Sequence, residues 1–193
     1  MTTATMTRTS RETDITVTVL PEDGKTEIST GIGFFDHMLT ALSVHSGIPM
    51  HIRAVGDTHV DAHHTVEDTG IVLGQALGQA LGDKSGIVRY GSAYIPMDES
   101  LAFCALDICN RPFLVFRAEF TNAMIGAYDA CLTEEFMRAF AFQAGLTLHC
   151  SVLYGKNDHH KTEALYKAVA HALAMAAAPS GTGECFSTKG ILG

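Results

Sequence analysis

Apolar residues alternate or recur at helical spacing along the first half of the chain. Residues 15–20 alternate with period two and are rich in β-branched side chains, which predicts a strand. Residues 21–24, Pro-Glu-Asp-Gly, are typical of a turn, so a hairpin with a second strand at 25–29 is expected. Helical spacing over 34–45 predicts a short helix, and residues 49–55 return to strand character.

A helix beginning at Val66 and stopping near Gly82 closes this first series. The patterns then repeat along the second half. They predict strands at 94–95, 101–108, 113–120 and 146–153, a helix from about Thr133, and a long helix ending near Pro179.

The same order of elements therefore occurs twice, which indicates an internal duplication. Aligning His63 with His159 also aligns Leu77 with Leu173, and a two-residue gap places His37 over Glu135. We divide the chain into a flexible N-terminal arm (1–10), a first half-repeat (11–90), a second half-repeat (91–178) and a C-terminal tail (179–193). Helices segregated on one face of a largely antiparallel sheet predict an α+β fold in each half.

Composition narrows the class of protein. The 193 residues are 47% hydrophobic, enough for a core, and the formal charge of −8 comes without any basic run, which argues against a nucleic-acid partner. No apolar run is long enough to span a bilayer, and the Thr-rich N-terminus does not resemble a secretion signal. Five cysteines without a C-x-x-C pair fit reduced thiols in a cytoplasmic protein.

Two histidine-rich clusters stand at matched positions of the two halves. Each has adjacent histidines followed by a glutamate: His63, His64 and Glu67 in the first cluster, and His159, His160 and Glu163 in the second. Metals such as Mn, Fe, Zn and Ni take imidazole and carboxylate ligands. Two solvated helix starts with stray histidines are the alternative, but two clusters in matched settings favour metal sites.

On a helix, His63 and Glu67 are four residues apart and share a face, whereas His64 lies about 100° away. One arrangement consistent with this is two ions that each take ligands from both halves. The adjacent histidines could equally be divided the other way, so that His63 pairs with Glu67 on one ion while His64 joins Glu163 on the other. A non-helical, cap-like conformation at these histidines is also open.

Further polar residues are candidates for the same site. His37 is a candidate ligand, His45 could line the site or be a core histidine, and His59 and His149 are candidates for orienting the ligands. Lys167 lies four residues after Glu163 on the same helix face. The segment 187–190, Ser-Thr-Lys-Gly, suits an anion such as phosphate, and no Gly-rich nucleotide motif precedes a helix.

Six segments of the chain carry a resemblance to a known family. They are Gly-Ile-Gly-Phe-Phe-Asp-His-Met-Leu (31–39), Gly-Asp-Thr-His-Val-Asp-Ala-His-His-Thr-Val-Glu-Asp (56–68), Pro-Met-Asp-Glu-Ser-Leu (96–101), Thr-Leu-His (147–149), Gly-Lys-Asn-Asp-His-His (155–160) with Glu163, and Ser-Thr-Lys-Gly (187–190). In this order they closely resemble the imidazoleglycerol-phosphate dehydratases, and the resemblance runs from about Arg11 to the C-terminus.

The resemblance implies a lyase of histidine biosynthesis that dehydrates imidazoleglycerol phosphate to imidazoleacetol phosphate. It implies a ribosomal protein S5 domain 2-like fold, in which each half is a mostly antiparallel four-stranded sheet with two helices on one face. It also implies two Mn²⁺ ions per active site and a 24-subunit assembly with active sites at subunit junctions.

The resemblance also assigns roles to residues. One ion is expected to take His37, His64, His159 and Glu163, and the other His63, Glu67, His160 and Glu135, where many members have histidine. The expected substrate-binding residues are Glu12, His37, His45, Arg89, Arg111, Lys167, Ser187, Thr188 and Lys189. A glutamine of many members is Ala41 here.

A carboxylate is expected to shuttle protons during the dehydration. Glu12 is the first candidate, and Glu67 and Glu163 are the others. Two other functions compete with the dehydratase: a dinuclear metallohydrolase of a phosphate ester, which would activate water, and a non-catalytic metal-storage cage. The cage leaves the 187–190 segment and Arg89 without a purpose.

Overall fold

The computed structural model describes residues 1–20, 24–181 and 183. Each half contains strand, strand, strand, helix, strand and helix in that order. The elements of the first half are β1 (Ala4–Thr9), β2 (Thr13–Val19), β3 (Glu27–Ser29), α1 (Gly33–Ser46), β4 (Met50–Gly56) and α2 (His63–Leu81). Those of the second are β5 (Tyr90–Met97), β6 (Ser100–Ile108), β7 (Phe113–Arg117), the short strands β8 (Met124–Ile125) and β9 (Tyr128–Asp129), α3 (Leu132–Ala144), β10 (Leu146–Tyr154) and α4 (Asp158–Ala177).

The two main sheets have the same topology. Their strand orders are β1-β2-β4-β3 and β5-β6-β10-β7. In each sheet one pair is parallel, β3 with β4 and β7 with β10, and the other pairs are antiparallel. The predicted α+β duplication is therefore confirmed, with β8 and β9 as an addition to the second half.

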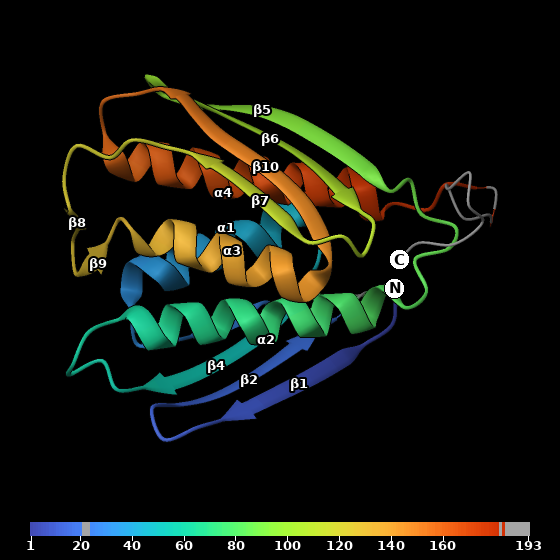
Figure 1. The fold of residues 1–193 in the computed structure, drawn as a ribbon, viewed down its shortest axis with the longest axis horizontal. Helices are drawn as coiled ribbons and strands as arrows, with labels where there is room; N and C mark the ends of the chain where they lie inside the picture. The colour runs from blue at the N-terminus through green and yellow to red at the C-terminus, as the bar shows by residue number, and fades with distance from the viewer. Residues whose placement is uncertain (21–23, 182, 184–193) are drawn as a thin grey trace.

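The sheets form the two outer layers and the helices lie between them (Figure 1). In β2 and β6 every second residue is buried, which is the pattern of a strand that packs one face on a core. α2 packs on β1 and β2, and α4 packs on β5 and β6. One continuous core joins both halves.

The helices pack in two pairs that cross the boundary between the halves, α2 with α3 and α1 with α4. Glycines allow α2 to approach α3 closely. A Cβ atom at Gly70 would lie 2.9 Å from the Phe136 carbonyl oxygen, and one at Gly74 would lie 2.7 Å from the Phe140 carbonyl oxygen. Both contacts advance by four residues, so the two helices run parallel.

Two local features differ from the sequence-based prediction. Part of the predicted N-terminal arm (1–10) forms β1, which pairs with β2. Its inward residues, Ala4, Met6 and Arg8, give too weak an apolar pattern to predict a strand. The predicted hairpin at 25–29 is wrong, because β3 pairs in parallel with β4 instead of with β2. Most of the tail, 179–193, lies outside the described residues.

In the described part of the chain, no helix is both long and apolar enough to cross a membrane.

Candidate metal centre

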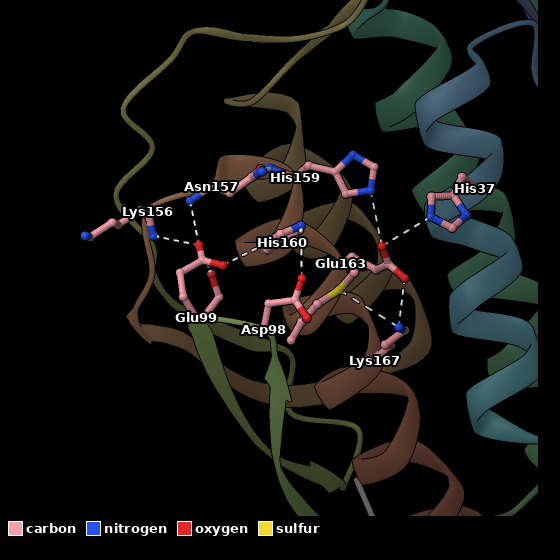
Figure 2. Close-up of polar contacts among 11 residues, drawn as sticks. His37, Asp98, Glu99, Lys156, Asn157, His159, His160, Glu163 and Lys167 are labelled. Carbon is pink, nitrogen blue, oxygen red and sulfur yellow. Dashed lines mark hydrogen bonds and ion pairs between the residues drawn. The ribbon is translucent and has the colours of Figure 1, made fainter.

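Three potential ligands converge where α1 packs on the first turns of α4. The Nε2 atoms of His37 and His159 lie 3.3 Å and 3.2 Å from Oε2 of Glu163. One ligand atom from each of the three residues lies within 4.8 Å of the other two (Figure 2). This spacing is compatible with a single cation bound between two imidazoles and a carboxylate.

Glu163 is the buried member of this group, whereas His37 is exposed. The other carboxylate oxygen of Glu163, Oε1, lies 2.7 Å from Nζ of Lys167, one helical turn further along α4. Burial opposes ionisation of Glu163, but Lys167 and His37 outweigh it and hold the pKa of the carboxyl below its usual value. The group therefore presents a negative charge at the position where a cation would bind.

The equivalent group also takes residues from both halves: two lie on α2 of the first half and one lies on α3 of the second. His63 and Glu67 share a face of α2, as predicted, with 3.8 Å between Nε2 and Oε2. Glu135 of α3 accepts two hydrogen bonds from Arg138, at 2.9 Å and 2.8 Å. Within the described residues, the group at Glu163 is the only one in which three potential ligands converge in this way.

The adjacent histidines of each cluster point in different directions. The rings of His63 and His64 are 6.0 Å apart at an interplanar angle of 87°, and those of His159 and His160 are 6.1 Å apart at 80°. All four histidines belong to helices, so the open possibility of a non-helical conformation is excluded. That the two histidines of one cluster serve different ions stays a prediction.

The second histidine of each cluster contacts carboxylates. Nδ1 of His64 lies 3.1 Å from Oδ2 of Asp57, and its Nε2 lies 3.8 Å from Oε2 of Glu12. Nδ1 of His160 lies 2.8 Å from Oε2 of Glu99. These hydrogen bonds raise the pKa of both histidines.

Sequence reasoning did not identify Asp57 and Glu99. It proposed His59 and His149 as orienting groups, but both are exposed, and His149 lies on the outer face of β10. Glu99 is 61 residues from His160, so only the tertiary fold could reveal this contact. Its place in the 96–101 segment was the one available signal.

Basic residues gather in two places along α4. Arg89 is buried and binds Asp107 through two hydrogen bonds of 2.6 Å and 2.9 Å, while Arg111 lies 3.6 Å from the same carboxylate. The backbone N–H of Arg89 donates to Ala176 near the end of α4. Lys167 lies beside Glu163 instead, so within a single chain Lys167 and the two arginines belong to different places.

His45 lies two turns beyond His37 on α1, and its Nδ1 is 3.3 Å from Nε2 of His171 on α4. Partial burial, Lys167 and His171 lower the pKa of His45. The ring is therefore mainly neutral at pH 7 and lies on the same seam of α1 and α4 as the candidate ligands. The predicted residues Ser187, Thr188 and Lys189 lie outside the described residues.

Comparisons with known proteins agree on one family. Residues 30–173 match the family model described as imidazoleglycerol-phosphate dehydratase. Curated proteins of that name from Listeria monocytogenes and from an Exiguobacterium strain are 54% and 52% identical to the chain. The alignments cover 100% and 98% of the chain and the same shares of those proteins.

Two crystal structures of such dehydratases have the same fold. The Staphylococcus aureus structure superposes with a TM-score of 0.84 at 41% identity and covers 91% of this chain and 98% of its own. The Pyrococcus furiosus structure gives a TM-score of 0.86 at 36% identity and covers 97% of this chain and 100% of its own.

Proposed function

Because the chain belongs to the imidazoleglycerol-phosphate dehydratase family of lyases, we propose that it converts D-erythro-imidazoleglycerol phosphate to imidazoleacetol phosphate and water. This step belongs to L-histidine biosynthesis, and we place it in the cytoplasm. The convergence of His37, His159 and Glu163 is the observation that carries the proposal. The reaction needs negative charge to be stabilised on an imidazole ring, and a metal site of this kind can bind such a ring.

Two Mn²⁺ ions are the proposed cofactors. Imidazole nitrogens and carboxylate oxygens are competent Mn²⁺ ligands, and the spacing within the Glu163 group fits one ion. His37, His159 and Glu163 would hold the first ion together with a His64. His63, Glu67 and Glu135 would hold the second ion together with a His160. Glu135 would then have to release Arg138 in order to bind the ion.

We propose that the missing ligand of each ion comes from a neighbouring subunit. Within one chain His64 contacts Asp57 and Glu12, while the Glu163 group is formed by α1 and α4. A 24-subunit assembly with active sites at subunit junctions would supply the missing histidines. Self-association is also supported by exposed apolar side chains on the second sheet and its margins, including Tyr94, Phe113 and Leu153.

In the proposed reaction the substrate loses hydroxide from the carbon next to the ring and a proton from the neighbouring carbon. The resulting enol takes up its keto form, and hydroxide and proton leave as water. When bound, the ions supply stabilisation for the negative charge that develops on the ring. Glu12 is the proposed proton carrier, because its exposed carboxylate lies 3.8 Å from Nε2 of His64, beside the expected ring position. Glu67 and Glu163 are the other candidates.

The phosphate of the substrate needs cationic and hydrogen-bonding partners. Lys167 and His45 lie one and two turns from the Glu163 group along the seam of α1 and α4, and are proposed to face the phosphate end. Arg89, Arg111 and residues 187–189 are the other proposed partners, reaching it from their own or a neighbouring subunit. Ala41 is buried on α1 and offers no polar side-chain atom.

Incubation with Mn²⁺ and imidazoleglycerol phosphate tests the function. The dehydratase produces one equivalent of ketone and no inorganic phosphate, and a chelator abolishes the reaction until Mn²⁺ is restored. Release of inorganic phosphate would identify a metallohydrolase instead. Failure to form either product, with metal bound, would favour the storage cage.

A further inference from the structure

The Glu99 carboxylate connects the β5–β6 turn to the start of α4 (Figure 2). Its Oε1 accepts the backbone N–H groups of Asn157 and Lys156, at 2.7 Å and 3.0 Å. Its Oε2 lies 2.8 Å from Nδ1 of His160. One oxygen is thus occupied by two donors from the backbone, and the other is directed at a single ring nitrogen.

This arrangement determines where the proton of His160 lies. The backbone N–H groups of Asn157 and Lys156 both donate to this carboxyl group and so favour its ionised form, which can only accept hydrogen bonds. Nδ1 of His160 must therefore carry a proton. In the neutral ring the lone pair is then on Nε2, which faces the exposed Asp98 at 3.7 Å.

We propose that Glu99 is a positioning residue that fixes His160 as the Nδ1–H tautomer and so makes Nε2 the metal-binding atom. This inference rests on the proposed metal-dependent function. A histidine ligand whose other nitrogen is held by a carboxylate has a fixed ring orientation and a more basic ligating nitrogen. Glu99 would therefore increase metal affinity without touching the ion.

The first half reaches the same arrangement from a different element. Asp57, in the loop between β4 and α2, approaches Nδ1 of His64 with both oxygens, at 3.1 Å and 3.3 Å. Asp57 has no backbone donors on its carboxylate among the hydrogen bonds recorded for the described residues, which distinguishes it from Glu99. The two carboxylates have the same relation to their histidines but differ in how firmly they are held.

That difference makes the two amide substitutions unequal. In Glu99→Gln the N–H groups of Asn157 and Lys156 still need an acceptor. The amide oxygen therefore faces them, and the NH₂ group faces His160. It would donate to Nδ1 and move the ring proton to Nε2, which can then no longer bind metal. In Asp57→Asn the amide is free to turn its oxygen to His64, and the original tautomer is retained.

The experiment compares Glu99→Gln, Asp57→Asn and, as a matched loss of charge, Glu27→Gln on the exposed part of β3. Two readouts are taken from the full-length protein. The first is the solid-state ¹⁵N spectrum of metal-free, sedimented protein with labelled histidine rings, assigned for His160 with the His160→Gln variant. The second is Mn²⁺ affinity and stoichiometry by titration, with melting temperatures as a check on folding.

We expect Glu99→Gln to exchange the Nδ1–H signal of His160 for an Nε2–H signal and to weaken one of the two Mn²⁺ sites about 10- to 100-fold. Asp57→Asn should retain the wild-type tautomer of His64, and Glu27→Gln should retain both the wild-type tautomers and the wild-type Mn²⁺ affinity. An unchanged His160 tautomer in folded Glu99→Gln would overturn the inference, as would equal Mn²⁺ affinity in Glu99→Gln and Glu27→Gln. Loss of the proposed function is distinguishable, because wild-type protein would then bind metal but form no ketone.

Discussion

His37 and Glu163 are 126 residues apart in the chain, yet Nε2 of the first lies 3.3 Å from Oε2 of the second. His45 and His171, two turns further along the same helices, are in contact at the same separation of 126 residues. The constant separation means that α1 and α4 run parallel. The Glu163 group, Lys167 and His45 therefore lie along the contact between these two helices.

Replacement of Glu163 should remove the first ion. Glu163→Gln retains the side-chain volume but loses the negative charge, and it leaves Lys167 without its ion-pair partner. We expect bound Mn²⁺ to fall by one ion per subunit and turnover to fall by more than about 100-fold, the upper end of the range for residues that only support a ligand. Metal analysis after gel filtration and an assay for the ketone measure both. Glu27→Gln is the control, and full metal content in Glu163→Gln would contradict the ligand assignment.

Two inactive variants should restore activity when they share an assembly. The proposed site takes Glu163 from one subunit and Glu67 from its neighbour, so Glu163→Gln and Glu67→Gln inactivate different contributors. Co-expression with distinct tags should yield mixed assemblies in which some sites are intact, and these should regain part of the wild-type turnover. Each variant purified alone is the control. If mixed assemblies are no more active than either alone, the sites are not shared between subunits in this way.

The close packing of α2 on α3 predicts opposite effects of two glycine substitutions. A Cβ atom at Gly74 would lie 2.7 Å from both the Phe140 carbonyl oxygen and Cβ of Gln143, so Gly74→Ala should destabilise the protein by about 1–3 kcal/mol. At Gly78 the nearest atom is 3.5 Å away. Gly78→Ala should be neutral or stabilise by up to about 1 kcal/mol through helix propensity. Urea unfolding of the metal-free variants measures both; equal stabilities would contradict the close approach.

Acid should weaken the start of α4 through Asp158. Burial opposes its ionisation, but the ion pair with Lys161 and the N–H groups of Asn122 and Thr121 lower the pKa of Asp158 to about 2. Because the folded pKa is below the unfolded one, this stabilisation is complete above about pH 4 and is lost as pH falls towards 2. It is worth about 2 kcal/mol for a shift of this size.

Asp158→Asn should lower stability at pH 7 by about 3 kcal/mol, since it leaves the buried Lys161 ammonium unpaired. The difference from wild type should shrink below pH 4. Asp14→Asn, which breaks the exposed pair with Arg53, is the control and should cost less than about 1 kcal/mol. Unfolding curves of metal-free protein between pH 2 and 7 would show a constant difference if Asp158 were not ionised.

The sequence predicted what depends on local spacing. The pairs His63–Glu67 and His159–Glu163 follow from helical periodicity, and the duplication follows from the alignment of the two clusters. The addition of His37 to the Glu163 group depends on the parallel packing of α1 and α4, which spacing along the chain does not encode. Glu99 was missed for the same reason. β1 was missed because its inward residues are weakly apolar, so that pairing with β2 determines its structure.

The packing of each helix pair across the boundary between the halves limits how the duplicated chain can have arisen. The Glu163 group takes His37 from the first half and two residues from the second, and the pairing of α2 with α3 is the reverse. A single half carries parts of both sets and completes neither. An ancestral chain of half the present length would therefore have bound metal in this way only as a twofold dimer, and fusion of two gene copies would have freed positions 37 and 135 to diverge.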